Sequence, residues 1–276
     1  SAGVGSHTIK YVYSDGGGCT DSTTQTVVVN GLPLVTFSGL NAAYCVDASA
    51  ATLSGFPAGG TFSGTGITGN NFTPAAAGVG THNITYTYTD SKGCSEDSIK
   101  SVIVNGLPVV SFAGLDTAYC MDAAPAPLSG TPAGGSFSGI GISGSTFYPF
   151  IAGTGSYSIT YTYTDGNSCI NTQTQSTNVV PVPVVSFSGL ASAYCVDVAA
   201  DTLTGSPSGG VFTGPGIAGN IFDPAAAGVG THSVKYVYAD VYGCSDSSSQ
   251  TVIVHGLPSV ALSGLNSQYC VDAAAV

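Results

Sequence analysis

The sequence predicts an all-β protein made of tandem β-sandwich repeats, and three observations support this prediction. The cysteines form two series with a period of 75 residues: Cys19, Cys94, Cys169 and Cys244, and Cys45, Cys120, Cys195 and Cys270. Segments in which apolar or aromatic residues alternate with polar ones recur at the same interval. Glycine and proline clusters separate these segments. Because a fixed period is typical of stacked modules, we expect several small, similar domains.

The period divides the 276 residues into three complete repeats between two partial ones. The predicted domains are 1–31 (a last hairpin), 32–106, 107–181, 182–256 and 257–276 (first strands). A proline follows the β-rich run at each boundary, at Pro33, Pro108, Pro183 and Pro258. Since proline fixes φ and no Gly/Ser linker intervenes, we expect stiff junctions and an elongated rod. The chain begins and ends within a repeat, so we expect it to be a window of a longer protein.

Within the repeat at 32–106, the clearest predicted strand is 81–90, THNITYTYTD. Its period-2 alternation indicates a half-buried strand, and we expect the face with Ile84, Tyr86 and Tyr88 to be buried. A turn at 91–93 and a strand at 94–104 complete a hairpin. Weaker strands are predicted at 34–38, 51–55, 60–63 and 71–73. PAAAGVG at 74–80 predicts one helical turn, which its glycines end.

The charge composition excludes several classes of partner. Charged residues make up 7% of the chain, with 15 acidic residues, four lysines and no arginine, and the formal net charge is −11. Nucleic-acid binding needs a positive surface, so we expect no nucleic-acid partner. No apolar run approaches the roughly 20 residues that span a bilayer. The first residues lack the pattern of a signal peptide. We therefore expect no direct membrane insertion.

The regular cysteine series indicate disulfides and therefore an oxidising compartment. Two pairing schemes fit the spacing. The first encloses each repeat, as Cys45–Cys94, Cys120–Cys169 and Cys195–Cys244, and leaves Cys19 and Cys270 to pair outside this window. The second joins neighbouring repeats through Cys19–Cys45 and its equivalents. We favour the first, because closing a loop of this size stabilises a small domain by roughly 3–4 kcal/mol.

The pattern SGL…YCVDA…LSG.PAGG.FSG.GI…F.P..AG.G.H.I.Y.YTD..GC covers the whole chain as four copies in register. It resembles the PKD-like and Ig-like tandem repeats of very large secreted proteins of Bacteroidota, including adhesins associated with gliding motility. The GC after a Tyr-rich strand, with a cysteine before an early strand, is its most specific element. The resemblance implies secretion, an Ig-like or PKD-like sandwich, a structural or adhesive role, and no catalytic residues or cofactor.

Aspartates flank the cysteines and are the only candidates for a metal site. They are Asp47, Asp122 and Asp197, two residues after one cysteine series, and Asp90, Asp165 and Asp240, four residues before the other. If Cys45 bonds Cys94, Asp47 and Asp90 come together, and two carboxylates could hold Ca²⁺. The alternative is that each aspartate caps a turn. We prefer this simpler interpretation and expect no metal.

The histidines are not candidates for catalysis. His7, His82 and His232 share one repeat position, which Tyr157 fills in the remaining copy. A ligand or general base would not be replaced by tyrosine, so we expect a structural strand residue.

The resemblance also implies O-glycosylation, because secreted Bacteroidota proteins carry glycans on Asp-Ser or Asp-Thr followed by a small aliphatic residue, Met or Thr. The chain offers DST, DSI, DTA and DTL. The acceptors would be Ser22, Ser98, Thr117 and Thr202.

We expect a non-enzymatic, secreted or cell-surface protein that serves as a rod-like stalk or a filament-forming segment. In a filament, 1–31 of one chain and 257–276 of another would complete a sandwich by strand addition, although about 24 residues of the period would be missing. The expected partners are copies of itself or flanking repeats, surface glycans and other cells. The alternative is a carbohydrate-binding or spacer module of a secreted hydrolase.

Overall fold

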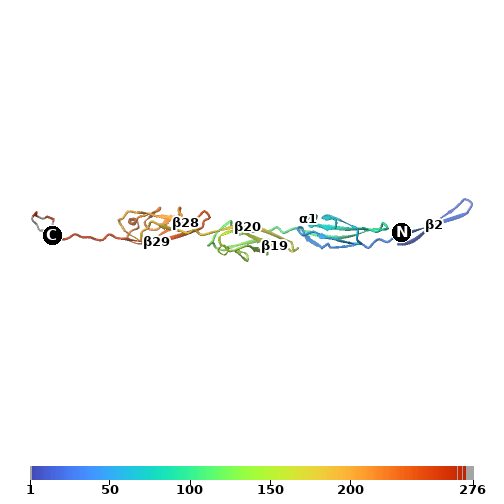
Figure 1. Cartoon of the computed structure of the whole chain (residues 1–276), viewed down its shortest axis with the longest axis horizontal. Helices are drawn as coiled ribbons and strands as arrows, with labels where there is room; N and C mark the ends of the chain where they lie inside the picture. Colours follow the sequence, from blue (N-terminus) through green and yellow to red (C-terminus); the bar gives the residue numbers. More distant parts are fainter. Residues whose placement is uncertain (1, 266, 269, 272–276) are drawn as a thin grey trace. The chain divides into compact units, whose positions relative to one another are not determined.

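The computed structural model describes residues 2–265, 267, 268, 270 and 271. Regular structure in these residues consists of β-strands and of the four-residue helices α1 (Pro74–Ala77), α2 (Pro149–Ala152) and α3 (Pro224–Ala227) (Figure 1). The predicted all-β class is therefore confirmed. No helix in the described part of the chain is long and apolar enough to cross a bilayer.

The chain divides into two compact units. The first comprises Ser1–Ser111, Gly130–Ser136 and Tyr161–Gln173, and the second comprises Phe112–Ser129, Phe137–Thr160 and Thr174–Val276. The division runs through the second repeat rather than between repeats, and the five-part domain organisation stays a prediction.

The first complete repeat contains two long strands and a series of short ones. The strands are β3 (Thr36–Ser38), β4 (Ala43–Cys45), β5 (Ala51–Thr52), β6 (Ser54–Phe56), β7 (Thr61–Ser63), β8 (Ile67–Thr68), β9 (Asn71–Phe72), β10 (Gly80–Thr89) and β11 (Ser95–Asn105). One sheet has the order β4-β11-β10-β7, in which β4 is parallel to β11 and the other pairs are antiparallel. Facing strands form the ladders β3-β6 and β5-β9-β8.

The core of this repeat lies between these two layers. Ile84 and Tyr86 of β10 are 0% and 2% exposed. They pack in one cluster with Phe37, Leu53 and Phe72 from the opposite layer. The predicted burial of this face of β10 is confirmed for Ile84 and Tyr86, whereas Tyr88 is half-buried at the edge of the cluster. Successive side chains of a strand point to opposite faces, so alternate residues of β10 point into the core.

The same series of strands follows twice more. In the second repeat it comprises β12 (Ser111–Ala113), β13 (Ala118–Cys120), β14 (Ala126–Pro127), β15 (Ser129–Thr131), β16 (Ser136–Ser138), β17 (Ile142–Ser143), β18 (Thr146–Phe147), β19 (Gly155–Thr164) and β20 (Ile170–Val180). In the third it comprises β21 (Ser186–Ser188), β22 (Ala193–Cys195), β23 (Asp201–Thr202), β24 (Thr204–Ser206), β25 (Val211–Thr213), β26 (Ile217–Ala218), β27 (Ile221–Phe222), β28 (Gly230–Ala239) and β29 (Ser245–His255). The third repeat has the sheet order β22-β29-β28-β25, equivalent to that of the first.

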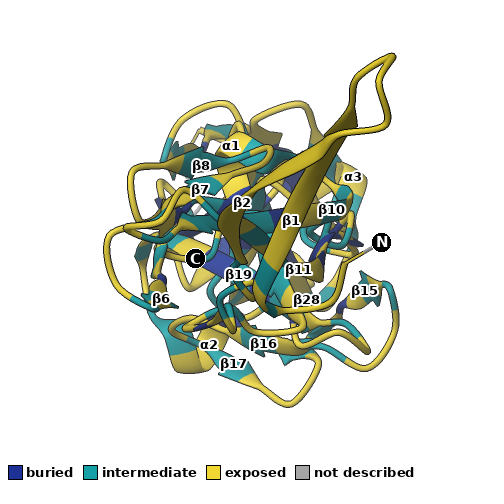
Figure 2. Cartoon of the chain, turned by 90° about the vertical axis from the view of Figure 1, so that its right-hand side faces the viewer, coloured by how far each residue is buried: buried dark blue, intermediate teal, exposed yellow. Residues whose placement is uncertain are grey.

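The two partial repeats differ from the complete ones. Residues before the first repeat form an isolated hairpin of β1 (Gly5–Ser14) and β2 (Thr20–Val29). Figure 2 shows this hairpin almost entirely in the colour of exposed residues. Its Ile9 and Tyr11 are 60% and 63% exposed, although the equivalent Ile84 and Tyr86 are buried. In 257–276, residues 266, 269 and 272–276 lie outside the described set, and the described residues carry no strand.

The core of the second repeat contains a buried hydroxyl group without a hydrogen-bond partner among the described residues. Thr177 is 3% exposed, and its Oγ1 has no hydrogen-bond partner among the described residues. The equivalent residues Val102 and Val252 are fully buried. Valine has nearly the same shape as threonine but no hydroxyl group to desolvate. The replacement Thr177→Val is therefore expected to raise the free energy of unfolding by about 1 kcal/mol. Urea unfolding checks this, and Thr172→Val, at an exposed position of the same strand, is the control.

Candidate functional site

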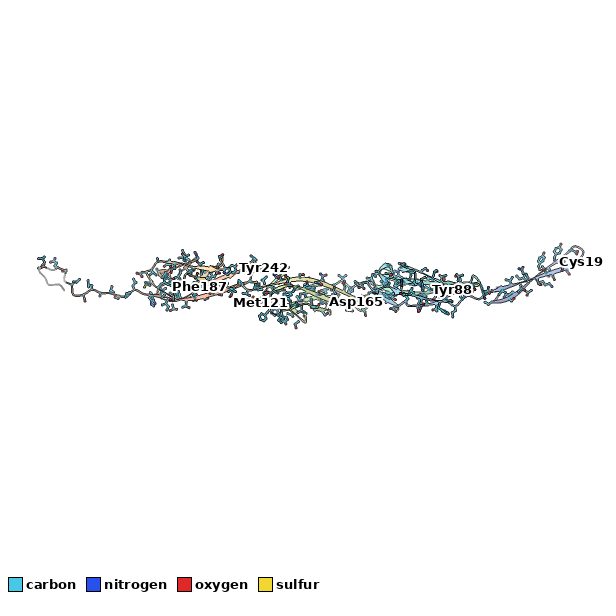
Figure 3. The ribbon with its side chains drawn as sticks, in the orientation of Figure 1. Cys19, Tyr88, Met121, Asp165, Phe187 and Tyr242 are labelled. Carbon is cyan, nitrogen blue, oxygen red and sulfur yellow. A yellow bond between two sulfur atoms is a disulfide. The ribbon has the colours of Figure 1, made fainter. Side chains whose placement is uncertain are left out.

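The turn between the two long strands of each repeat presents a cysteine. In the second repeat, Oδ1 of Asp165 accepts hydrogen bonds from the backbone N–H groups of Asn167 and Cys169, both at 2.8 Å. Asp15, Asp90 and Asp240 make the equivalent two bonds to their own turns. The carboxylate thus replaces a backbone acceptor and fixes the position of the cysteine. We call Cys19, Cys94, Cys169 and Cys244 the turn cysteines. Figure 3 shows Cys19 at the tip of its hairpin.

A second cysteine ends the short parallel strand of each complete repeat. Cys45 on β4 lies opposite Asn105 of β11, and Cys195 on β22 lies opposite His255 of β29. The preceding tyrosine packs against the core, as Tyr44 does against Phe72 with ring centroids 5.5 Å apart. Since successive strand residues point to opposite faces, the cysteine is directed outward. We call Cys45, Cys120, Cys195 and Cys270 the strand cysteines, the last by its position in the repeat.

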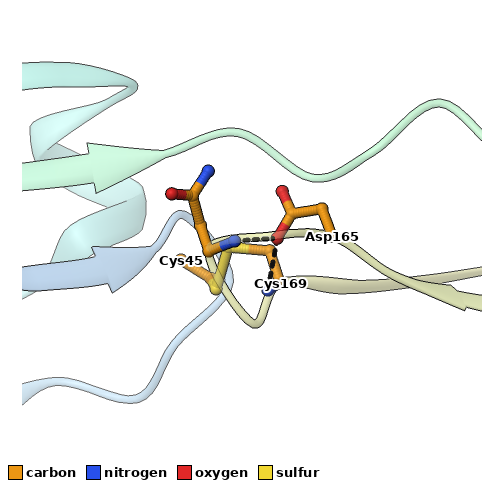
Figure 4. The surroundings of a disulfide bond; sticks show 4 residues. Cys45, Asp165 and Cys169 are labelled. Atoms are coloured by element: carbon orange, nitrogen blue, oxygen red, sulfur yellow. Dashed lines mark hydrogen bonds between the residues drawn. A yellow bond between two sulfur atoms is a disulfide. The ribbon is translucent and has the colours of Figure 1, made fainter.

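Disulfides join a strand cysteine of one repeat to the turn cysteine of the next repeat. Cys45 bonds Cys169 (Figure 4), and Cys120 bonds Cys244, with a Cα–Cα distance of 5.5 Å in both pairs. Each bond spans 124 residues of sequence and lies within one compact unit. Cys169 and Cys244 are completely or almost completely buried. The bonds couple consecutive repeats covalently, in addition to the peptide chain.

The predicted pairs Cys45–Cys94, Cys120–Cys169 and Cys195–Cys244 are wrong. Cys45 lies beside Asn105, at the end of β11, whereas Cys94 immediately precedes Ser95, at its beginning. A strand of this length spans roughly 33 Å, and a disulfide needs Cα atoms within about 7 Å. The alternative Cys19–Cys45 is wrong as well, because Cys45 is bonded to Cys169. The pairing of Cys19 and Cys270 with cysteines outside this window stays a prediction.

The same geometry separates the aspartates that were considered as candidate calcium ligands. Asp47 follows the strand cysteine, and Asp90 belongs to the turn at the opposite end of β11. The equivalent pairs, Asp122 with Asp165 and Asp197 with Asp240, are separated in the same manner along β20 and β29. No group of three potential ligands from His, Cys, Asp and Glu occurs in the described residues. The aspartates of the turns act as caps for backbone N–H groups instead.

One turn contains a strained residue. Ser168 has φ of 66°, whereas the equivalent Gly18, Gly93 and Gly243 have φ of 84° to 85°. The left-handed region costs a residue with a Cβ about 1 kcal/mol or more. Ser168→Gly is therefore expected to stabilise the second repeat by up to about 1 kcal/mol, which thermal unfolding checks. A decrease in the melting temperature would show that the Ser168 side chain compensates for the strain.

The histidines at the shared repeat position hold the loop that follows each short helix. Nε2 of His82 lies 2.9 Å from the carbonyl oxygen of Gly78, and that of His232 lies 2.8 Å from Gly228 O. In the second repeat the hydroxyl of Tyr157 donates to Ala152 O at 2.6 Å. A ring N–H and a phenolic O–H fill the same role as donors, which explains why histidine and tyrosine exchange at this position.

Tyr194, next to Cys195, makes a hydrogen bond that is specific to the third repeat. Its hydroxyl donates to Oδ2 of Asp201 at 2.7 Å, whereas Ala51 and Ala126 stand at the position of Asp201 in the other repeats. Burial raises the pKa of Tyr194, and the hydrogen bond to Asp201 adds to this, against the lowering effect of the backbone N–H of Ala191.

This raised pKa predicts a loss of stability at alkaline pH. The folded state holds the proton more tightly than the unfolded state, so the contribution is complete below the unfolded pKa of about 10 and is lost as pH rises through the folded pKa. With free thiols alkylated, urea midpoints from pH 8 to 11 are expected to fall more steeply for the wild type than for Tyr194→Phe. Parallel curves would contradict the prediction.

A groove recurs beside the buried tyrosine of the long strand. In the third repeat it has a volume of about 520 Å³, and its lining includes Thr204, Ser208, Asn220 and Tyr236. The equivalent groove of the first repeat has about 140 Å³. The Tyr236 hydroxyl is engaged, since it donates to Pro207 O and accepts from Gly210 N.

The predicted glycan acceptors lie at different places in the fold. Ser22 on β2, Thr117 before β13 and Thr202 on β23 are exposed, whereas Ser98 on β11 is half-buried. Steric access therefore differs among them, and their occupancy stays a prediction.

No protein-family model matches the sequence, and the search of curated proteins gave no match. Among solved structures, the chain is similar to a Ca²⁺-stabilized adhesin of an ice-binding Antarctic bacterium, at 14% identity and a TM-score of 0.33 over 91% of this chain and 81% of that one. A 1.5-MDa bacterial ice-binding adhesin gives 11% identity and a TM-score of 0.31 over 82% and 98%. The extracellular cadherin domains of protocadherin Gamma B2 give 8% identity and a TM-score of 0.25, over 93% of this chain and 67% of that one. Values this low do not assign a function.

Proposed function

We propose that this chain is a structural and adhesive repeat segment of an extracellular protein, in which disulfides reinforce the series of repeats. The observation that supports this most directly is the pairing of Cys45 with Cys169 and of Cys120 with Cys244. The two disulfide loops overlap in sequence, so at least one bond bridges every peptide bond between Cys45 and Cys244. A protein outside the cell, exposed to proteases and mechanical load, benefits from such redundancy.

The proposed location is the cell surface or the extracellular medium. Disulfides persist in oxidising compartments and are rare in the cytosol. A net charge of −11 favours solubility and disfavours anionic surfaces. Antibodies raised against the purified chain are expected to label intact source cells or their medium, and labelling only after permeabilisation would contradict the proposal.

The more specific proposal is a rod-like stalk or filament-forming segment of a large surface protein of the PKD-like type found in Bacteroidota. The sequence resemblance supports this type. Completion of a partial repeat by strand addition from another chain belongs to this proposal. Electron microscopy of the purified protein tests assembly: filaments are expected, and dispersed single particles would argue against it.

A non-catalytic role forms part of the proposal. Three of the four histidines are engaged with backbone carbonyls, His7 with Gly3, His82 with Gly78 and His232 with Gly228. The expected partners are copies of the repeat, surface glycans and other cells.

A carbohydrate-binding or spacer module of a secreted hydrolase is the second candidate, because the groove of the third repeat presents Thr204, Ser208 and Asn220. Glycan-array binding that Asn220→Ala abolishes would support it. Val241→Ala, in an exposed turn outside the groove, is the matched control. An array without any signal would remove this candidate.

A further inference from the structure

The groove of the third repeat lies where one layer of the sandwich is interrupted. In that layer β23 pairs with β27 and β24 pairs with β21, so the two ladders diverge on either side of Leu203. The groove, of about 520 Å³, is lined by Thr204 and Gly205 of β24 and by the turn residues Gly219 and Asn220. This volume is within the range of ligand pockets in proteins. One wall of the groove is therefore a strand of the interrupted layer.

The hydrogen bonds of Leu203 show which edge of β24 this wall presents. The N–H of Leu203 donates to Asn220 O at 2.7 Å, and the Leu203 carbonyl oxygen accepts from Nδ2 of Asn220 at 3.4 Å. Leu203 is 1% exposed, and a Cβ at Gly205 would meet the ring of Tyr236, so both residues face the core and the pleat continues between them. Alternate strand residues direct their backbone groups to the same edge. The N–H and C=O groups of Gly205 therefore point into the groove, away from β21.

This edge of β24 is open to a further strand. No strand in the described part of the chain pairs with it. An unpaired strand edge is a template for hydrogen bonding to another polypeptide, and Gly205, Gly209 and Gly210 have no side chains that could cover it. None of the described residues that line the groove is charged. Its aromatic residues, Phe212 and Tyr236, are 8% and 1% exposed, so neither offers a free ring face to a sugar. These features favour an extended, uncharged peptide over a glycan.

The first repeat has the same arrangement. Every residue that lines its groove is equivalent to a residue that lines the groove of the third repeat. The N–H of Leu53 donates to Asn70 O at 2.7 Å, and a Cβ at Gly55 would meet the ring of Tyr86. The backbone groups of Gly55 are therefore directed as those of Gly205 are. Equivalent sites on successive repeats would strengthen weak binding through multivalency.

We propose that these grooves bind an extended, uncharged peptide segment of another protein, which adds to β24, or to β6 in the first repeat, as a further strand. Its main chain hydrogen-bonds the N–H and C=O groups of Gly205 or Gly55, in the place that β27 or β9 occupies farther along the same layer. Main-chain bonds supply the affinity in this mode of recognition. The proposal names a class of partner for the proposed adhesive role and rests on that role.

The test titrates the ¹⁵N-labelled full-length chain with an acetylated and amidated hexapeptide of alternating serine and valine. Saturable shifts of the amide resonances of Gly205 and Gly55 are expected. The same peptide with every backbone nitrogen methylated cannot donate hydrogen bonds and is expected to bind roughly tenfold more weakly. Equal binding of the two peptides, or no shift at millimolar peptide, would overturn the proposal. Shifts caused by cellohexaose but not by the peptide would overturn it in favour of a glycan.

A variant of one groove uses the other groove as its internal control. Ser208 lines the groove of the third repeat and is exposed, and alanine stands at the equivalent position of the first repeat. Ser208→Trp is expected to fill this groove, to weaken the response of Gly205 roughly tenfold and to leave that of Gly55 unchanged. Ser249→Trp, at an exposed position of β29 outside the groove, is the matched control. An unchanged response of Gly205 in Ser208→Trp would place the peptide elsewhere and overturn the proposal. Cell labelling tests the proposed function separately, so the two failures are distinguishable.

Discussion

Replacing Cys45 and Cys169 together by serine is expected to lower the free energy of unfolding of the linked repeats by about 2–5 kcal/mol. The bond closes a loop across 124 residues of sequence. It restricts the unfolded chain far more than the folded one, and the restriction increases with loop length. Urea unfolding of the oxidised wild type and of the double variant measures the difference. Cys19→Ser, at an exposed cysteine without a bond in the structure, is the control and is expected to leave the midpoint unchanged.

The Cys45–Cys169 bond should hold the two fragments together when the chain is cut between these cysteines. A site-specific protease sequence inserted in the exposed turn 91–93 lies inside the loop from Cys45 to Cys169 and outside that from Cys120 to Cys244. After cleavage, the fragments are expected to run as one species on a denaturing gel without reductant in the wild type and to separate on the same gel in the double variant. The same insertion in the equivalent turn 16–18 lies outside both loops and is expected to release its fragment at once. Separation of the wild-type fragments without reductant would contradict the pairing.

Gly130→Ala is expected to destabilise the second repeat by about 3 kcal/mol. A Cβ at Gly130 would overlap the ring of Tyr161. That ring cannot move away, because it is 1% exposed and its hydroxyl donates to Pro132 O and accepts from Gly135 N at 2.8 Å. Gly55 and Gly205 meet the rings of their own tyrosines in the same manner. Thermal unfolding followed by tyrosine fluorescence measures the effect.

The control for this prediction is Gly166→Ala in the same repeat. No heavy atom lies within 4 Å of a Cβ built at Gly166, and the equivalent positions carry Ser91 and Val241. The expected change is within about 0.5 kcal/mol. If the two variants were equally stable, the close packing of Gly130 against the tyrosine would not be a constraint in the folded protein.

Strong local patterns predicted the larger elements of the fold. The alternation in 81–90 and the turn that follows it predicted β10 and β11, because long half-buried strands repeat their apolar residues with period 2. The single helical turn at 74–80 was expected, and α1 is present there. Short elements without a pattern of their own were missed: β4 has three residues, and β8 lies in a glycine-rich stretch for which no strand was predicted. Tertiary pairing creates such strands, β4 through its parallel register with β11.

The residues of the candidate site were predicted, but most of their bonding partners were not. The aspartates before the turn cysteines were expected to cap turns, and Asp15, Asp90, Asp165 and Asp240 do so. The hydrogen bonds that make histidine and Tyr157 interchangeable were not predicted, because their acceptors are backbone carbonyls, which have no signature in a sequence.

The sequence by itself determined the period, the β-class, the two cysteine series and the face of β10 that carries Ile84 and Tyr86. Only the tertiary structure decided the disulfide partners. Cys169 lies one period of 75 residues after Cys94, so the two are equivalent turn cysteines of consecutive repeats. The sequence pattern alone therefore cannot distinguish them as partners of Cys45. The length of β11, which holds Cys45 and Cys94 at its opposite ends, makes the nearer partner unreachable. A strand is rigid and roughly 33 Å long, and that length places the bond in the next repeat.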